Sequence, residues 1–458
     1  MTMIKLYNTL TRTVEEITLI EPPAAKMYSC GPTVYDFAHI GNLRTYIFND
    51  LLKRTLIYLG YKVIHVMNLT DVDDKTIRAS QKEKIPLRQY TDRYIRFFLE
   101  DLEKLNIIKP DILPRATDHI DDMIKMIKTL LDKGFAYKGT DGSIYFDIGK
   151  FPDYGKLSGI SYVKGLKAGA RVSLDEYSKE EAADFALWKA YSPEDGEVFW
   201  DSPFGKGRPG WHIECSAMST KYLGESFEFH TGAVDLIFPH HENEIAQTEG
   251  ATGKPWVKYW VHGEHLLVEG RKMSKSEGNY YRLSDIIERG FNPLAFRYLA
   301  LTAHYRQKLN FTWESLTSAQ NALNRLYEMA SSFSSTKKIF QNKVKIWRKN
   351  FNDAIASDLG LPQALALIWE MLKSDLLEEE KYSLLLDWDK VLGLDLEKGA
   401  GMKTIFEAPQ EIEKLAAERE ILRKEKKFKE ADLIRKKIES SGWLIEDTSE
   451  GPKLKKIK

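Results

Sequence analysis

A strand–helix–strand pattern in residues 27–71 constrains the fold of this chain more than any other feature of its sequence. Short apolar segments at 27–29 and 62–71 have the length of buried strands. Between them, residues 42–59 carry apolar side chains at near-helical spacing, and Gly60 follows as a helix-ending glycine. Parallel neighbouring strands require a crossover of this kind. The pattern therefore predicts an α/β fold in which a ligand binds at the carboxyl ends of the strands.

A second unit of the same kind lies far downstream. The segment FEFHTGAVDLIF at 227–238 precedes a predicted helix, and YWVHGEHLLVEG at 259–270 precedes a lysine-rich loop. We therefore expect a Rossmann-like parallel sheet that is split by an inserted α/β domain and followed by an all-α helical domain and a small C-terminal domain. The expected boundaries are 1–113 for the first half of the sheet domain, 114–200 for the insertion, 201–305 for the second half, 306–400 for the helical bundle and 401–458 for the C-terminal domain.

Composition limits the compartment and the partners. No run of eighteen apolar residues occurs and the first residues lack a secretory pattern, so we expect a cytoplasmic protein with no membrane partner. Two cysteines in 458 residues cannot form a disulfide framework, which leaves the thiols for metals or catalysis. Because 67 basic residues balance 67 acidic ones, any surface for a nucleic acid must be local. Residues 421–458 are such a region, with twelve basic and seven acidic side chains. On charge alone, an ordinary solvated helix explains them equally well.

The two cysteines, Cys30 and Cys215, are candidate metal ligands. A stretch after the second one, PHHENE, places His240 and Glu244 four residues apart, on one face of a helix. Two thiolates, one imidazole and one carboxylate are a typical zinc ligand set. The alternative for each cysteine, taken singly, is a small buried hydrophobe, and the residue type alone does not decide between the two.

Two segments suit the binding of nucleotide phosphates. The first, HIGN, places His39 and Asn42 at a strand-to-helix junction, where backbone N–H groups and the helix dipole favour anions. The second, KMSKS, carries Lys272 and Lys275, whose flexible stems can bring compact charges to phosphate oxygens. Alone, the first could be an ordinary helix start and the second a solvated loop.

In this order, on the two halves of a split sheet, the two segments resemble the signature sequences of class I aminoacyl-tRNA synthetases. Over almost its whole length the chain resembles the cysteinyl-tRNA synthetase family. The matching stretches are CGPTVYDFAHIGN, NLTDVDDKTIRAS, YFDIGKFPDYGKLS, DFALWK, GRPGWHIECSAMS, DLIFPHHENEIAQ, KMSKSEGN, NFTWESL and DKVLGLDL.

The resemblance implies a complete active site. One zinc ion per chain would be bound by Cys30, Cys215, His240 and Glu244. ATP, accompanied by Mg²⁺, would be bound by His39, Gly41, Asn42 and Lys275, and catalysis would depend on His39, Asn42, Lys272 and Lys275. The substrate cysteine would lie near Thr70, Trp211 and Asp235.

The expected activity is that of a monomeric ligase. It activates L-cysteine with ATP to cysteinyl-adenylate and transfers it to the terminal adenosine of cysteine tRNA, whose GCA anticodon would be read by the basic C-terminal domain. Zinc would select the substrate thiol, because packing separates near-isosteres by only ~1–3 kcal/mol. Two rivals are a cysteine:amino-sugar ligase of the mycothiol pathway, which generally lacks the last domain, and a catalytically silent relative.

Some residues keep two interpretations, and some depart from the family pattern. His212, Glu214 and His241 flank the expected ligands and would either support them by hydrogen bonds or simply pack. The acidic residues at 71, 73 and 74 are expected to end a strand and cap the next helix rather than bind a metal. HTGAVD at 230–235 has fewer glycines than is usual in the family, and the tail has GPKL where many relatives have Gly-Thr-x-Trp.

Overall fold

The computed structural model covers residues 1–458, and the described residues are 3–159, 167–172, 183–273, 278–333, 341–401, 410–425, 427–441, 443–448 and 451–456. By its internal contacts the chain forms two units. The first consists of Met1–Leu323 and Phe333–Asp395, and the second of Asn324–Ser332 and Leu396–Lys458.

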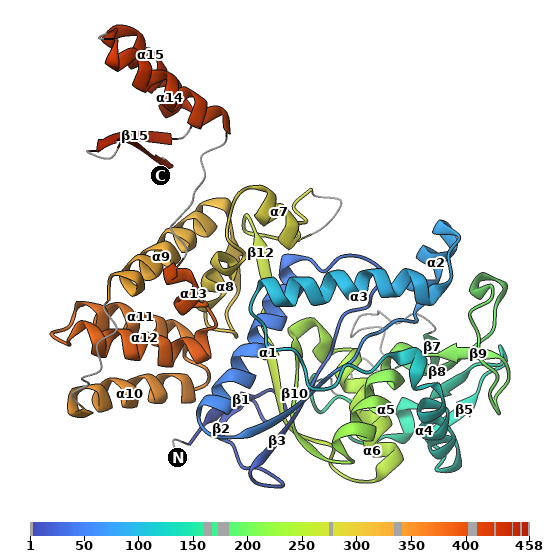
Figure 1. Ribbon diagram of the computed structural model, residues 1–458. Helices are drawn as coiled ribbons and strands as arrows, with labels where there is room; N and C mark the ends of the chain where they lie inside the picture. The colour runs from blue at the N-terminus through green and yellow to red at the C-terminus, as the bar shows by residue number, and fades with distance from the viewer. Residues whose placement is uncertain are drawn as a thin grey trace. The chain divides into compact units, whose positions relative to one another are not determined.

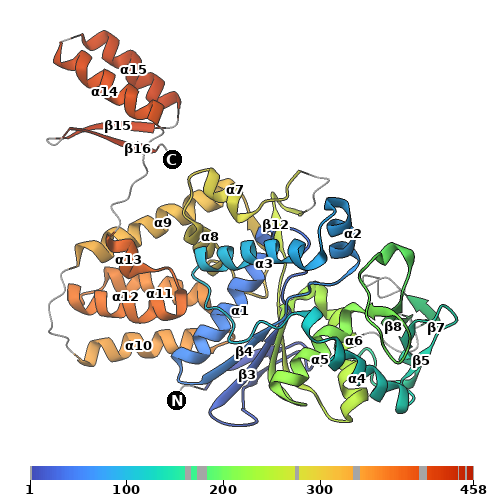
Figure 2. The same ribbon diagram turned by 45° about the vertical axis from the view of Figure 1, so that its right-hand side comes forward.

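A four-stranded parallel sheet forms the centre of the first unit, with strand order β11-β10-β3-β4. Its strands are β3 (Ala24–Ser29), β4 (Lys62–Met67), β10 (Phe227–Ala233) and β11 (Val257–Gly263). Helix α1 (Ile40–Tyr58) covers one face, while α5 (Trp211–Leu223) and α6 (His240–Thr252) cover the other (Figure 2). The carboxyl ends of β3 and β10, whose paired residues are 202 positions apart in sequence, are thereby neighbours. The predicted split parallel α/β fold is confirmed.

The segment between the two halves of this sheet has a sheet of its own, coloured green to teal in Figure 1. Its strands are β5 (Ala136–Lys138), β6 (Ile144–Phe146), β7 (Lys167–Val172), β8 (Ala183–Ala190) and β9 (Gly207–Pro209). The helices before it are α2 (Asp74–Glu83), α3 (Leu87–Lys104) and α4 (Ile120–Asp132). Strand β9 leads directly into α5, so the insertion fixes the entry of a helix that carries candidate site residues.

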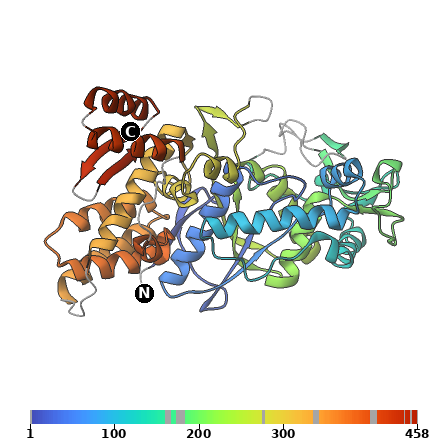
Figure 3. The same cartoon turned by 45° about the horizontal axis from the view of Figure 1, so that its top comes forward.

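Small strands and a group of helices complete the first unit. The strands are β1 (Lys5–Asn8), β2 (Thr13–Glu16), β12 (Leu266–Val268), β13 (Arg271–Lys272) and β14 (Leu309–Phe311). The helices are α7 (Leu283–Glu288), α8 (Pro293–Leu301), the part of α9 (Trp313–Ser332) up to Leu323, α10 (Gln341–Ala356), α11 (Leu361–Lys373) and α12 (Glu378–Leu392). Figure 3 shows α10, α11 and α12, in orange, side by side.

The second unit contains a helix pair and a hairpin. Its elements after α9 are α13 (Leu396–Gly401), α14 (Gln410–Lys424), α15 (Phe428–Ser440), β15 (Trp443–Thr448) and β16 (Gly451–Lys456). Ile412, Ile434, Ile438 and Trp443 belong to a small separate core. The five domain boundaries expected from the sequence stay predictions.

Candidate metal centre and active site

The side chains of the four candidate metal ligands come close together next to the carboxyl ends of the parallel strands. Cys30 follows β3, Cys215 lies in the middle of α5, and His240 and Glu244 occupy the first two turns of α6. One potential ligand atom of each residue lies within 4.8 Å of those of the other three. Cys30 is 8% exposed and the other three are almost fully buried. The fold thus brings together side chains that the sequence separates by up to 214 positions.

Glu244 is held between two imidazoles. Its Oε1 lies 2.7 Å from His240 Nε2, and its Oε2 lies 2.7 Å from His230 Nε2. Burial opposes ionisation, but the two histidines lower the pKa of Glu244 to about 2. Burial also disfavours a charged His240, yet Glu244 and Cys215 raise the pKa of that imidazole to about 10. The carboxylate is therefore in the ionised form that a metal ligand requires.

A chain of buried histidines surrounds this cluster. His212 Nδ1 lies 2.9 Å from His240 Nδ1, and His241 Nε2 lies 3.3 Å from Cys30 Sγ. The other ring nitrogen of His241 lies 2.8 Å from His262 Nε2, and His262 Nδ1 lies 2.7 Å from Thr9 Oγ1. Burial and the neighbouring histidines hold the pKa of His241 well below its usual range. A neutral imidazole with one nitrogen anchored in this way presents a fixed lone pair from the other.

His230 and His262 are not among the site residues predicted from the sequence. Both lie on parallel strands, His230 on β10 and His262 on β11, and both are buried. The available signal was a histidine near the carboxyl end of each predicted buried strand, which is where ligands bind in such sheets.

Of the three expected substrate residues, Trp211 contacts the cluster and Thr70 contacts Glu214, the residue before Cys215. Trp211 opens α5, and its ring centroid lies 4.1 Å from that of His240. Thr70 donates to Glu214 Oε2 at 2.9 Å and accepts from Asn68 Nδ2 at 3.1 Å. Asp235 lies after β10, in a short 3₁₀ turn, where its side chain is 60% exposed. It lines a cavity of about 410 Å³ together with Tyr7 and Thr9.

The HIGN segment begins helix α1 with a reciprocal cap. Asn42 N–H donates to His39 Nδ1 at 3.1 Å, and His39 N–H donates to Asn42 Oδ1 at 3.2 Å. A Cβ at Gly41 would lie 2.9 Å from the His39 ring and 3.4 Å from Met273 Cε. A side chain at position 41 would therefore crowd the imidazole of His39 over the helix start.

The residues on either side of 274–277 lie near the same helix start. Lys272 ends β13, and its carbonyl accepts from Asn279 Nδ2 at 3.1 Å. Ile40 N–H donates to the carbonyl of Tyr281 at 2.9 Å, which joins the segment after KMSKS to the beginning of α1. Lys275 lies outside the described residues. The two signature segments of the sequence are thus neighbours in the fold.

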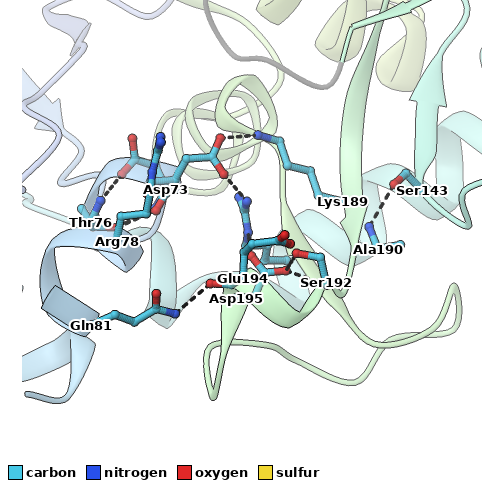
Figure 4. Close-up of polar contacts among 12 residues, drawn as sticks. Asp73, Thr76, Arg78, Gln81, Ser143, Lys189, Ala190, Ser192, Glu194 and Asp195 are labelled. Atoms are coloured by element: carbon cyan, nitrogen blue, oxygen red, sulfur yellow. Dashed lines mark hydrogen bonds and ion pairs between the residues drawn. The ribbon is translucent and has the colours of Figure 1, made fainter. Parts of the chain in front are cut away.

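A polar network fastens helix α2 to the insertion (Figure 4). Asp74 accepts from Lys189 Nζ at 3.0 Å and also pairs with Arg208, which in turn donates to Asp195 at 2.7 Å. Gln81 donates to the carbonyl of Glu194 at 2.8 Å. Burial opposes ionisation of Asp74, but the two basic groups lower its pKa. The network joins the beginning of α2, just after Thr70, to β9, just before Trp211. The acidic run thus has a structural role, and Asp73 caps α2 as expected.

Substituting Asp74→Asn leaves Lys189 and Arg208, each less than 10% exposed, without their shared anion. We expect the free energy of unfolding to fall by about 1–3 kcal/mol, with faster amide exchange in α2 and around β9. Hydrogen exchange and urea denaturation measure both effects. The control is Asp118→Asn, because its pair with Arg88 is about half exposed and is expected to contribute only ~0–1 kcal/mol. Equal effects of the two substitutions would contradict the structural role of the network.

Comparison with known proteins agrees with this architecture. Residues 16–321 match the family model described as tRNA synthetases class I (C) catalytic domain. A methionyl-tRNA synthetase from Mycobacterium tuberculosis in complex with methionyl-adenylate has a similar fold, with a TM-score of 0.57 and 15% identity, over 82% of this chain and 91% of that one. A LeuRS–tRNA–LeuAMS complex from Agrobacterium radiobacter aligns with a TM-score of 0.59 and 12% identity, over 84% of this chain and 86% of that one. The split sheet with its two adjoining signature segments defines the catalytic domain of a class I aminoacyl-tRNA synthetase.

Full-length relatives narrow the class. The chain is 47% identical to the cysteine–tRNA ligase of Chlamydia felis, over 99% of this chain and 98% of the relative. It is 45% identical to that of Brachyspira hyodysenteriae, over 99% of both chains. The chain belongs to the cysteine–tRNA ligase family, and it is a ligase. Among the described residues, no helix has the length and apolarity needed to cross a membrane.

Proposed function

We propose that this protein activates L-cysteine with ATP and transfers the cysteinyl group to the 3′ adenosine of cysteine tRNA, with zinc selecting the substrate thiol. The observation that carries the proposal is the convergence of Cys30, Cys215, His240 and Glu244 beside Trp211. Family membership supports the ligase reaction, and the four buried donors support the choice of amino acid.

The donor set fits zinc on chemical grounds. Two sulfurs, one imidazole nitrogen and one carboxylate oxygen match its ligand preferences, and tetrahedral zinc accepts such a mixture. Zinc bound by these four residues would accept a cysteine thiolate as a further ligand far better than a serine hydroxyl, because zinc can expand its coordination from four to five ligands. The chain's own contribution is to orient the ligands: His212 holds the far nitrogen of His240, and His230 holds the second oxygen of Glu244.

The remaining site residues align the two reactants. Trp211 and Thr70 border the amino-acid side, while His39, Gly41 and Asn42 form the start of α1, where backbone N–H groups favour phosphate. Lys272 and Lys275 would stabilise the pyrophosphate leaving group as charge develops, and Mg²⁺ would accompany ATP. No side chain acts as a nucleophile, because the cysteine carboxylate attacks the α-phosphate. Catalysis therefore rests on orientation and charge.

We further propose that the basic residues of 421–458 contact tRNA and that this region reads the GCA anticodon. Helix α15 supports a phosphate-binding surface through Lys436 and Lys437, which are exposed side chains on a unit with its own core. We also propose that the protein is a monomer, that it is located in the cytoplasm, and that its chain divides into the five parts expected from the sequence.

The test is charging of purified cysteine tRNA with radiolabelled cysteine and, separately, with radiolabelled serine. Efficient esterification by cysteine and negligible esterification by serine are expected. Cysteine-dependent ATP–pyrophosphate exchange without tRNA charging would instead favour a ligase for another acceptor, such as an amino sugar. The absence of both reactions would contradict the proposed function.

Substituting Lys275→Ala is expected to lower the rate of ATP–pyrophosphate exchange by about 10²–10³-fold, with little change in the KM for cysteine. The reason is that a cation at the leaving group acts mainly in the transition state. Exchange kinetics at saturating cysteine measure the effect. Lys308→Ala, which removes another exposed lysine, is the control. A variant that loses cysteine affinity but keeps its rate would place Lys275 in the amino-acid site instead.

A further inference from the structure

Two members of the candidate zinc set also face a second pair of donors. Cys30 and Glu244 combine either with Cys215 and His240 or with His230 and His241, and in each group one atom per residue lies within 4.8 Å of the others. We call the first group the cysteine-pair site and the second the histidine-pair site. All four residues of the histidine-pair site are buried, with Cys30 the most exposed at 8%.

The two shared residues, Cys30 and Glu244, make contacts with both groups. Glu244 directs Oε1 to His240 and Oε2 to His230, each at 2.7 Å. Cys30 Sγ lies 3.7 Å from Glu244 Oε1 and 3.3 Å from His241 Nε2. The Glu244 carboxylate and the Cys30 thiol thus belong to both ligand groups. One ion can therefore bind at the cysteine-pair site or at the histidine-pair site, and binding at one site excludes binding at the other.

One of the two imidazoles of the histidine-pair site has the outer support that bound metals require, whereas among the described residues the buried Nδ1 of His230 has no hydrogen-bond partner. A ligating imidazole is normally fixed by a hydrogen bond at its other nitrogen. His241 has this support from His262, which is itself held by Thr9, just as His240 has it from His212. A histidine that only packs in the core does not need a chain of hydrogen bonds such as the one from His241 through His262 to Thr9.

Charge also favours the histidine-pair site as a resting position. A divalent ion there meets one thiolate and one carboxylate, so the buried complex is neutral. At the cysteine-pair site the same ion meets two thiolates and one carboxylate, which leaves a net negative charge. An uncompensated charge is disfavoured in a buried environment.

We propose that Cys30, His230, His241 and Glu244 form a second position for the divalent ion, alternative to the cysteine-pair site. This inference rests on the proposed function only in taking Cys30 and Glu244 as metal ligands. The histidine pair packs on Trp260, with ring centroids at 4.5 Å for His230 and 5.1 Å for His241, whereas His240 packs on Trp211. The histidines that belong to only one of the two groups therefore pack on different tryptophans.

The test removes both ligands that belong only to the cysteine-pair site. The variant Cys215→Ala/His240→Ala is purified, loaded with zinc alone and analysed by metal content and by X-ray absorption at the zinc edge. We expect about one ion per chain, with one sulfur and two imidazole nitrogens as neighbours. Adding His230→Ala and His241→Ala to this variant should abolish the binding. Adding His212→Ala, a buried histidine that belongs to neither site, should leave the ion and its neighbours unchanged.

The outcomes separate this inference from the proposed function. If the wild-type protein binds zinc with two sulfur neighbours and the folded double variant binds none, the histidine-pair site is refuted and the cysteine-pair site stands. If the ion in the double variant has no imidazole neighbours, or loses them with His212→Ala, the inference is also refuted. If the wild-type protein binds no zinc, both proposals fail. Circular dichroism shows whether each variant is folded, and a double variant that does not fold is replaced by Cys215→Ser/His240→Gln.

Discussion

Substituting Cys215→Ser is expected to lower kcat/KM for cysteine-dependent ATP–pyrophosphate exchange by about 10⁴-fold, without creating efficient use of serine. Cys215 is almost fully buried, and it supplies one of only two thiols in the chain. A hydroxyl in its place is a poor zinc ligand, so the ion is lost from the cysteine-pair site, and the geometry of the amino-acid side is lost with it. Exchange kinetics with cysteine and with serine, together with the zinc content, measure the effect.

The control for this experiment is Ser216→Ala, in the next position of α5. Its hydroxyl makes only long contacts, at 3.5 Å to the His212 carbonyl and 3.4 Å to the Glu244 carbonyl. We expect this variant to differ from the wild type by less than about tenfold. The proposed use of zinc would be wrong if Cys215→Ser lost its metal but still preferred cysteine over serine as strongly as the wild type.

The local sequence patterns predicted helices and strands well where a recognisable residue, such as a capping residue, marks the end of the element. Helix α1 was expected from 42 to 59 and runs from Ile40 to Tyr58, because the cap of His39 starts it earlier than the apolar spacing indicates. The four zinc candidates were predicted because cysteine is scarce in this chain and because an i, i+4 pair shares one helix face.

The supporting residues could not be predicted in the same way. His230 and His262 are single histidines in apolar strands, and their partners come from α6 and from the loop after β1. The residues next to them in the sequence do not identify those partners, because contacts between distant segments depend on the order of strands in the sheet. The partners of Asp74 could not be predicted for the same reason, because its two cationic partners lie 115 and 134 positions away, in the insertion.

Arg297 is the clearest case of a residue without a sequence signal. It lies in α8, is fully buried, and donates to Asp50 Oδ2 at 2.5 Å and to the carbonyl of Leu392 at 2.6 Å. Asp50 also accepts from Arg54 at 2.8 Å. The guanidinium therefore joins α1, the helix that begins with HIGN, to the helical group of the first unit.

Substituting Arg297→Met should lower the free energy of unfolding by about 3–5 kcal/mol, because it leaves a buried carboxylate with a single cationic partner and the buried carbonyls of Leu105 and Leu392 without a strong donor. Urea denaturation of the full chain measures the change. The control is Arg348→Met, whose side chain is 46% exposed and pairs with Asp387 at 3.3 Å, and which should change stability by no more than ~1 kcal/mol. Because Asp50 lies on the same helix as Asn42, a rise in the KM for ATP in the still-folded variant is also expected. A stable Arg297→Met protein with normal ATP kinetics would show that α1 is positioned by its apolar contacts alone.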